Sequence, residues 1–211
     1  MAEMQRRKIG SRAFPAFLSG QVGQPAVIVL QEWWGVTDMI KEHALKIAAQ
    51  GYRVLIPDVY KGKLGVDKEE AHHLMSNLDF PAAVVEIGDA ASYLKEEGAP
   101  HVGVVGFCMG GALALGAAAK SANITAAAPF YGVNFGLFSA EELVGTAIQG
   151  HFGREDKMMG FSDAATGEKL EATLSAAGVE AQTFIYDKVR RAYMYIFRPM
   201  AYALLECCIK Y

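Results

Sequence analysis

The chain has 211 residues, of which 52% are hydrophobic and 20% charged, and its formal net charge is −3 at pH 7. This length suits one folded domain with a single core, and the composition excludes a disordered chain. The slightly acidic balance gives no reason to expect nucleic acid or an anionic membrane as a partner. We therefore expect one globular domain over residues 1–211, and a monomer is ordinary for a chain of this size.

Targeting segments and the number and spacing of cysteines indicate the cellular compartment of the protein. No stretch of about 18 apolar residues predicts a membrane span, and no apolar segment follows the charged start MAEMQRRKIG, so we expect no secretory signal. The three cysteines, Cys108, Cys207 and Cys208, show no CxxC spacing and do not indicate a disulfide framework. A reducing, cytoplasmic location is the expectation.

Short apolar runs alternate with longer amphipathic ones along the chain. In chain order, the pattern predicts a strand at 26–30, a helix at 37–50, a strand at 52–57, helices at 67–78 and 81–97, a strand at 101–106, a helix at 109–120, strands within 124–132 and 145–153, a helix at 162–177 and a strand within 179–187. Thr37 and Gly51 suit the two ends of the first helix. Such alternation predicts an α/β protein with a mostly parallel, doubly wound sheet and helices on both faces. Reactive groups then gather at the carboxyl ends of the strands.

Cys108 lies at such an end. Gly106, Cys108 and Gly110 form a G-x-C-x-G pattern, which is the nucleophile elbow of hydrolases with cysteine in place of serine. The glycines remove side chains that would collide at the strand-to-helix turn. The helix N-terminus favours a thiolate, and the N–H of Met109 is a natural oxyanion donor. The alternative is a small buried cysteine among packing glycines.

The segment GFCMGGALAL resembles the elbow of the dienelactone hydrolases, cysteine-dependent members of the α/β-hydrolase superfamily. Further similarity lies in LQEWWGV, YRVLIPDVYKGK, AAAPFYG and GHFGREDKMM, so that the resemblance covers about residues 24–187. The resemblance implies the three-layer α/β-hydrolase fold and hydrolysis of small esters or lactones, with no metal and no organic cofactor.

Carried over by position, the resemblance gives each matching residue a role. Cys108 is the nucleophile and Asp156 the acid of the triad. Glu32 faces the resting cysteine and helps to shift its proton, and Trp33 donates the second oxyanion N–H. On the residues alone, Glu32 also reads as a surface charge and Asp156 as a turn residue of GREDK.

The triad histidine has no counterpart at its expected place. The family carries it shortly after the last strand, where this chain has VRRAYMY and Arg191 stands at the histidine position. A guanidinium stays protonated and cannot replace a general base. His151 lies on the right rim, but we interpret it as a structural histidine at a strand end.

The tail 198–211 is short for the covering helix that ends such folds, so we expect an atypical C-terminal part. An altered exon end, read-through or a true pseudo-enzyme would each explain it. Two functions stay open: a hydrolase impaired by the missing histidine, and a ligand-binding or interaction protein without chemistry. A thiol redox sensor is disfavoured, because adjacent Cys207 and Cys208 form a disulfide only with strain.

Overall fold

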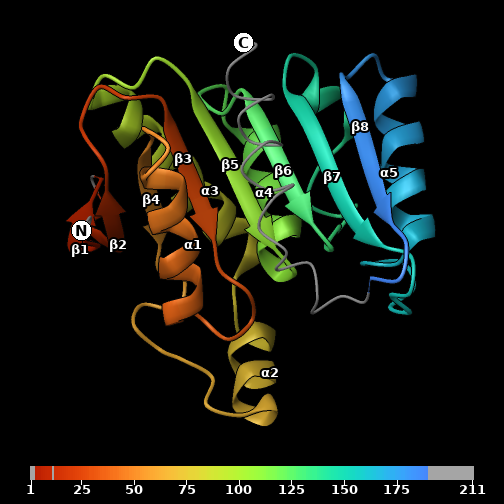
Figure 1. Cartoon of the computed structure of the whole chain (residues 1–211), viewed down its shortest axis with the longest axis horizontal. Coiled ribbons are helices and arrows are strands. Elements are labelled where there is room, and N and C mark those ends of the chain that lie inside the picture. The colour runs from red at the N-terminus through yellow and green to blue at the C-terminus, as the bar shows by residue number, and fades with distance from the viewer. Residues whose placement is uncertain (1–2, 11, 190–211) are drawn as a thin grey trace.

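The computed structural model of the chain describes residues 3–10 and 12–189. Its eight strands form one sheet in the order β1-β2-β4-β3-β5-β6-β7-β8 (Figure 1). The strands are β1 (Gln5–Ile9), β2 (Phe14–Ser19), β3 (Ala26–Leu30), β4 (Arg53–Pro57), β5 (Val102–Phe107), β6 (Ala126–Phe130), β7 (Ala147–Gly153) and β8 (Ala181–Tyr186). The pairs from β4 to β8 are parallel, whereas β1 and β2 pair antiparallel with each other, and β2 pairs antiparallel with β4.

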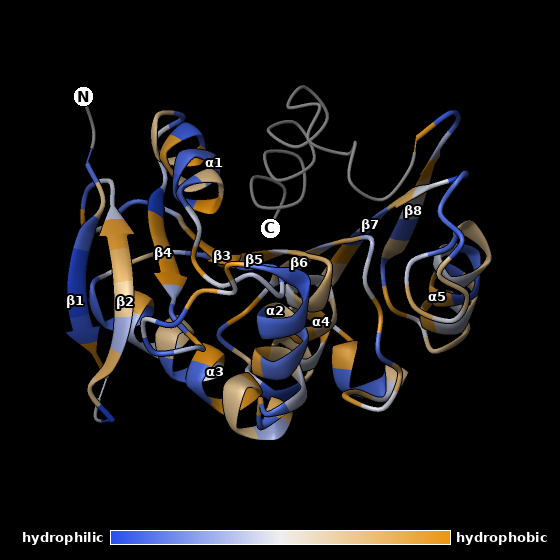
Figure 2. Ribbon diagram, turned by 90° about the horizontal axis from the view of Figure 1, so that it is seen from below, coloured by the Kyte–Doolittle hydropathy of each residue, from blue (hydrophilic) through white to orange (hydrophobic). Residues whose placement is uncertain are grey.

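Helices cover both faces of this sheet, as predicted (Figure 2). On one face α1 (Asp38–Ala48) packs against β3 and β4, and on the other lie α3 (Phe80–Glu96), α4 (Met109–Lys120) and α5 (Ala164–Ala176). The short α2 (Lys68–Ser76) lies beyond the carboxyl ends of the parallel strands, and the 3-10 turn η1 (Ala140–Leu143) contacts α4 and α5. The predicted doubly wound α/β fold is confirmed.

Side-chain caps explain where three of the helices begin. Thr37, Asp67 and Asp79 precede α1, α2 and α3, and each side chain accepts a hydrogen bond from a backbone N–H of the first turn. The start of α4 differs, because its N-cap is Cys108 and no side chain caps it. The first N–H groups of α4 therefore face the carboxyl end of the sheet without a capping side chain.

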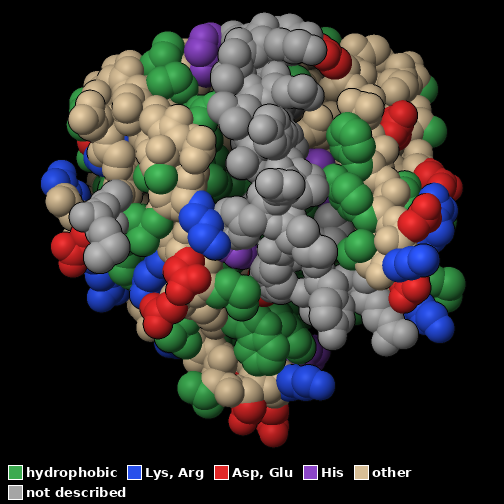
Figure 3. All heavy atoms as spheres, viewed as in Figure 1, with side chains coloured by type: hydrophobic (Ala, Val, Ile, Leu, Met, Phe, Trp, Pro, Cys, Tyr) green, Lys and Arg blue, Asp and Glu red, His purple; other side chains and the backbone are tan. Residues whose placement is uncertain are grey.

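The core consists of the strands and the inner helix faces. All residues of β3, β4, β5, β6 and β7 are buried, as expected for parallel strands covered on both sides. Charged side chains gather instead over β1, α1 and α5 and at the tip formed by α2 (Figure 3). Among the helices of residues 3–10 and 12–189, none is long and apolar enough to cross a membrane.

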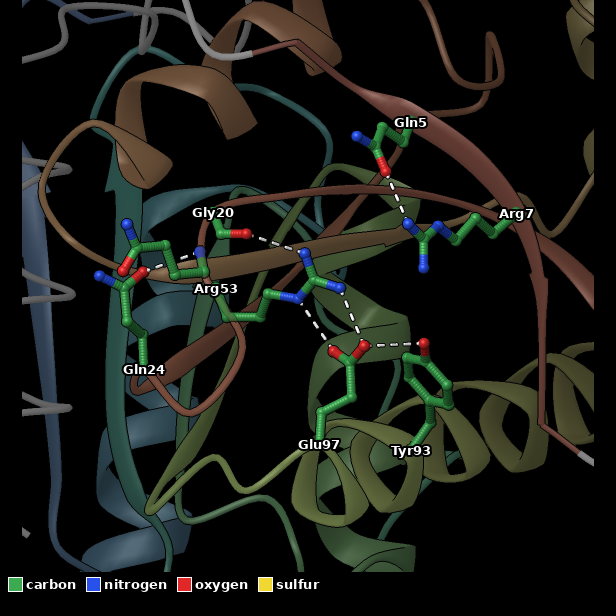
Figure 4. Close-up of polar contacts among 8 residues, drawn as sticks. Gln5, Arg7, Gly20, Gln24, Arg53, Tyr93 and Glu97 are labelled. Atoms are coloured by element: carbon green, nitrogen blue, oxygen red, sulfur yellow. Dashed lines mark hydrogen bonds and ion pairs between the residues drawn. The ribbon is translucent and has the colours of Figure 1, made fainter.

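A buried ion pair lies at the amino end of the sheet (Figure 4). Arg53, the first residue of β4, donates from Nε and Nη2 to the two carboxylate oxygens of Glu97 at 2.9 and 3.0 Å. Its Nη1 donates to the carbonyl of Gly20 at 2.9 Å, and the Tyr93 hydroxyl donates to Glu97 at 2.8 Å. This amino-end clamp joins β4, the end of α3 and the chain after β2, far from the carboxyl ends.

Candidate active site

The backbone at Cys108 makes a sharp turn between β5 and α4. Cys108 has φ 56° and ψ −118°, a conformation that L-residues rarely adopt and that costs about 1–3 kcal/mol. Two hydrogen bonds hold it, since its N–H donates to the Phe130 carbonyl at 2.9 Å and its carbonyl accepts from Gly111 N–H at 2.9 Å. The residue is 6% exposed, so the thiol lies in a largely buried place at the helix start.

Glycines allow backbone segments to approach this turn closely. A Cβ on Gly106 would lie 2.0 Å from the Gly110 carbonyl oxygen, and one on Gly110 would lie 2.5 Å from that of Gln31. A Cβ on Gly132 would lie 1.9 Å from the Cys108 carbonyl oxygen. The turn is therefore packed between the segment after β3 and the segment after β6, which brings both to Cys108.

Glu32 and Tyr131 lie on these two segments. The hydroxyl of Tyr131 donates to Oε1 of Glu32 at 3.2 Å and so joins the carboxyl ends of β3 and β6. Tyr131 itself has φ 39°, and its N–H donates to the His151 carbonyl at 2.8 Å. Tyr131 was not among the residues selected from sequence, although its place directly after a strand, in AAAPFYG, is a usable signal.

Tyr60 approaches the turn from the segment after β4. It is 6% exposed, and its hydroxyl lies 3.3 Å from Sδ of Met109, the residue after Cys108. Burial, and second the charge of Cys108, raise the pKa of Tyr60 above its usual value of 10.0, so the phenol stays a neutral donor. Sequence analysis missed Tyr60 as well, because nothing local predicts a contact across 49 residues.

Asp156 lies in the loop after β7, on the same rim. Its Oδ1 accepts from Met158 N–H at 3.0 Å, whereas its Oδ2 is buried and has no hydrogen-bond partner in the described part of the chain. The loop reaches the segment after β6, which packs against Cys108, through Phe161, whose carbonyl accepts from Val133 N–H at 2.9 Å. Asp156 thus presents a buried oxygen that can accept a hydrogen bond, as the acid of a triad must.

His151 is buried in β7 among aromatic side chains. Its ring stacks on Phe130 at 4.2 Å and on Phe184 at 5.4 Å, and its Nδ1 lies 2.9 Å from the Tyr186 hydroxyl. Burial lowers its pKa from 6.5 to about 3, so the ring is neutral at physiological pH. These contacts agree with the interpretation of His151 as a structural histidine.

The other four histidines lie on α1, on α2 and directly before β5. His43 is buried in α1 with its ring 5.5 Å from that of Phe107, and burial, followed by Lys46, lowers its pKa to about 4. His72 and His73 are on α2, and His73 lines a pocket of about 430 Å³ beside Tyr60. His101 precedes β5, at the amino end of that strand.

Trp33 and Arg191 were also predicted from the sequence to belong to the site. Trp33 lies in the turn between Glu32 and Gly35, beside the close contact of Gly110 with Gln31, and its ring packs edge-on against Trp34 at 5.0 Å. Arg191 lies outside the described residues. Within residues 3–10 and 12–189, no group of three or more His, Cys, Asp and Glu side chains has the arrangement of a metal site.

A cysteine at a strained strand-to-helix turn and a helix start without a capping side chain form an arrangement suited to acyl transfer through sulfur. Among models of protein families, the one described as "Dienelactone hydrolase family" matches residues 14–203 of the chain.

The chain belongs to the dienelactone hydrolase family.

Two curated relatives match part of the chain. Protein usf of Aquifex pyrophilus is 33% identical over 145 residues, which cover 63% of this chain and 61% of that protein. Carboxymethylenebutenolidase of Pseudomonas putida is 32% identical over 120 residues, 52% of this chain and 50% of the enzyme. The chain therefore spans between half and about three fifths of the length of these curated relatives.

Solved structures share the fold along the whole chain. A Klebsiella pneumoniae protein crystallised as a candidate dienelactone hydrolase has a TM-score of 0.82 at 21% identity, covering 100% of this chain and 99% of its own. The dienelactone hydrolase-like promiscuous phosphotriesterase P91, from metagenomic libraries, has a TM-score of 0.80 at 18% identity, covering 99% and 97%. This dienelactone hydrolase family member therefore has the α/β-hydrolase fold.

Proposed function

We propose that the chain hydrolyses small esters or lactones through a thioester on Cys108. One observation carries this proposal: Cys108 occupies the strained turn between β5 and α4, where its sulfur meets the uncapped start of a helix. A helix N-terminus stabilises a thiolate and the negative charge that develops on a carbonyl oxygen. The name of the Pseudomonas putida relative, carboxymethylenebutenolidase, supports a lactone as the substrate class.

The proposed first step is acylation of the sulfur. Glu32, held by the Tyr131 hydroxyl, takes the thiol proton, and the thiolate attacks the carbonyl carbon of the ester. The N–H groups of Met109 and Trp33 bind the resulting oxyanion. The bond from the carbonyl carbon to the leaving oxygen then breaks, and the alcohol leaves with the proton.

The second step is attack of water on the thioester, which releases the acid and restores the thiol. In a complete triad a histidine, oriented by Asp156, removes the proton from that water. Here Arg191 stands at the histidine position, so we propose that this step is slow and that the chain is an impaired hydrolase. Removal of a triad member in a serine protease leaves roughly 10³-fold catalysis, so weak turnover is the expectation rather than none.

The experiment compares turnover of p-nitrophenyl acetate by the unmodified chain, Cys108→Ala and Arg191→His. We expect Cys108→Ala to abolish turnover and Arg191→His to raise the steady-state rate at least tenfold, about 1.4 kcal/mol of barrier. High turnover by the unmodified chain through Cys108 would show that another base serves the site.

A second candidate function is a ligand-binding or interaction protein on the same fold. It is favoured by the loss of the histidine at position 191 and by the engagement of His151 with Tyr186. The same experiment separates the two functions, because a protein of this second kind shows no turnover and no acylation that depends on Cys108.

A further inference from the structure

We infer that Tyr60 is a positioning residue that holds the first turn of α4 through Met109, so that the N–H of Met109 faces the oxyanion. This inference rests on the proposed function, since it concerns the same acyl-transfer site.

The first turn of α4 has few other means of being held. Its sequence is Met109-Gly110-Gly111, so Met109 carries the only side chain among the first three helical residues. Its N-cap, Cys108, makes no capping side-chain hydrogen bond. A methionine has three rotatable side-chain bonds and adapts readily to its surroundings, so it needs a partner to be fixed. Besides the backbone contacts of this turn, the Met109 side chain is therefore what can tie its first three helical residues to a neighbouring element.

Tyr60 supplies the partner. Its hydroxyl lies 3.3 Å from Met109 Sδ, and Tyr60 and Met109 are 6% and 1% exposed. A tight turn fixes the Tyr60 backbone, because Lys61 N–H donates to the Asp58 carbonyl at 2.9 Å and Lys63 N–H to the Tyr60 carbonyl at 3.2 Å. The contact therefore connects the rigid carboxyl end of β4 to the residue whose N–H is the proposed oxyanion donor.

The electrostatic setting suits a permanent donor. Burial and the Cys108 charge keep the phenol of Tyr60 protonated, so its hydroxyl still donates after the thiol ionises. Met109 Sδ accepts and cannot donate, so the direction of the hydrogen bond is fixed. Tyr60 thus keeps one role through the reaction, which is to hold Met109.

The test is a double-mutant cycle of Tyr60→Phe and Met109→Leu, with Tyr93→Phe as the matched control, because the Tyr93 hydroxyl donates to Glu97 in the amino-end clamp. The readout is the rate at which p-nitrophenyl acetate acylates Cys108, with the site of the adduct assigned by peptide mass spectrometry. We expect each single variant to acylate about tenfold more slowly, the double variant to be no slower than either, and the control to match the unmodified chain.

Two further readouts separate positioning from a general loss of structure. Alkylation of Cys108 by iodoacetamide needs no oxyanion donor, so its rate should change by less than twofold in Tyr60→Phe. Hydrogen exchange at the Met109 amide, followed by NMR, should become at least tenfold faster in Tyr60→Phe and stay unchanged in Tyr93→Phe.

Fold-losses that multiply in the double variant would overturn the inference, as would unchanged Met109 exchange in Tyr60→Phe. Absence of a Cys108 adduct in the unmodified chain would overturn the proposed function instead, and amide exchange alone would then decide the role of Tyr60. Should Tyr60→Phe fail to fold, Met109→Leu takes its place in each measurement.

Discussion

The Tyr131 hydroxyl lies 3.2 Å from the carboxylate of Glu32, a residue 99 positions earlier in the chain. This hydrogen bond joins the ends of two strands separated in the sheet by β5, the strand that leads into Cys108. It therefore ties the Glu32 carboxylate to the two segments that flank the strand leading into Cys108.

Replacement of Tyr131 by Phe removes this donor and leaves the ring in place. A hydrogen bond to a charged group contributes about 1.5 kcal/mol, so we expect acylation of Cys108 to slow roughly tenfold. The measurement is the burst of p-nitrophenolate, corrected for the spontaneous rate. A rate within twofold of the unmodified chain would mean that Glu32 does not need Tyr131.

Gly106→Ala tests the packing of the turn at Cys108. The new Cβ would lie 2.0 Å from the Gly110 carbonyl oxygen, so the backbone must move, and we expect a loss of about 3 kcal/mol in the free energy of unfolding. Gly88→Ala in α3 is the control, because its Cβ would meet Ser121 at an ordinary 3.5 Å. Helix propensity predicts that this control is neutral or stabilising by up to about 1 kcal/mol. Urea denaturation checks both variants.

The amino-end clamp gives a prediction about stability alone. The Arg53 and Glu97 side chains are 9% and 15% exposed, so Arg53→Met leaves a largely buried carboxylate without its cation. We expect a loss of about 3 kcal/mol in the free energy of unfolding, with the rate of Cys108 acylation unchanged in the folded protein. Arg12→Met breaks the more exposed pair with Asp89 and should cost less than about 1 kcal/mol. Equal losses in the two variants would contradict the prediction that the amino-end clamp contributes more to stability than the exposed pair.

The pKa of His151 predicts how stability varies with pH. The buried ring has a pKa of about 3, against 6.5 for an unperturbed histidine, so between these values the unfolded chain binds a proton that the folded chain does not. This contribution to stability is complete above pH 6.5 and is lost as the pH falls towards 3. When the pH falls from 7 to 5, the free energy of unfolding should decrease by about 2 kcal/mol less in His151→Phe than in the unmodified chain.

The measurement is the free energy of unfolding in urea at both pH values. His72→Phe, on the exposed surface of α2, is the control for loss of a histidine in general. A pH dependence in His151→Phe equal to that of the unmodified chain would contradict the prediction.

The central fold could be predicted because its signals are local. The apolar run Ala26–Leu30 is a strand with the predicted bounds, and Thr37 caps the helix that follows it. The hairpin of β1 and β2 was missed because β1, QRRKI, has no apolar run and is largely exposed. Its partner β2 carries Pro15 opposite Lys8, and a proline, which has no backbone N–H to donate, breaks the usual strand pattern.

The candidate site was predictable only in part, for a related reason. Cys108 follows from a contiguous motif, whereas the contacts of Tyr131 with Glu32 and of Tyr60 with Met109 bridge 99 and 49 residues. Such contacts depend on strand order, and β3 lies between β4 and β5 although β4 comes later than β3 in the chain. Local sequence patterns predict where each strand ends and the next segment begins. The order of the strands in the sheet decides which of these segments become neighbours. The predicted roles of the site residues stay predictions, for Cys108, Glu32, Met109, Asp156, Trp33 and Arg191 alike.

The amino-end clamp and the turn at Cys108 lie at opposite ends of the sheet and share no residue. The change in the free energy of unfolding caused by a substitution in one of them should therefore add to the change caused by a substitution in the other. A laboratory-evolution campaign can therefore first introduce stabilising substitutions around Arg53. The added stability then offsets destabilising substitutions in the loops after β4 and β7, while Gly106, Gly110 and Gly132 are left unchanged.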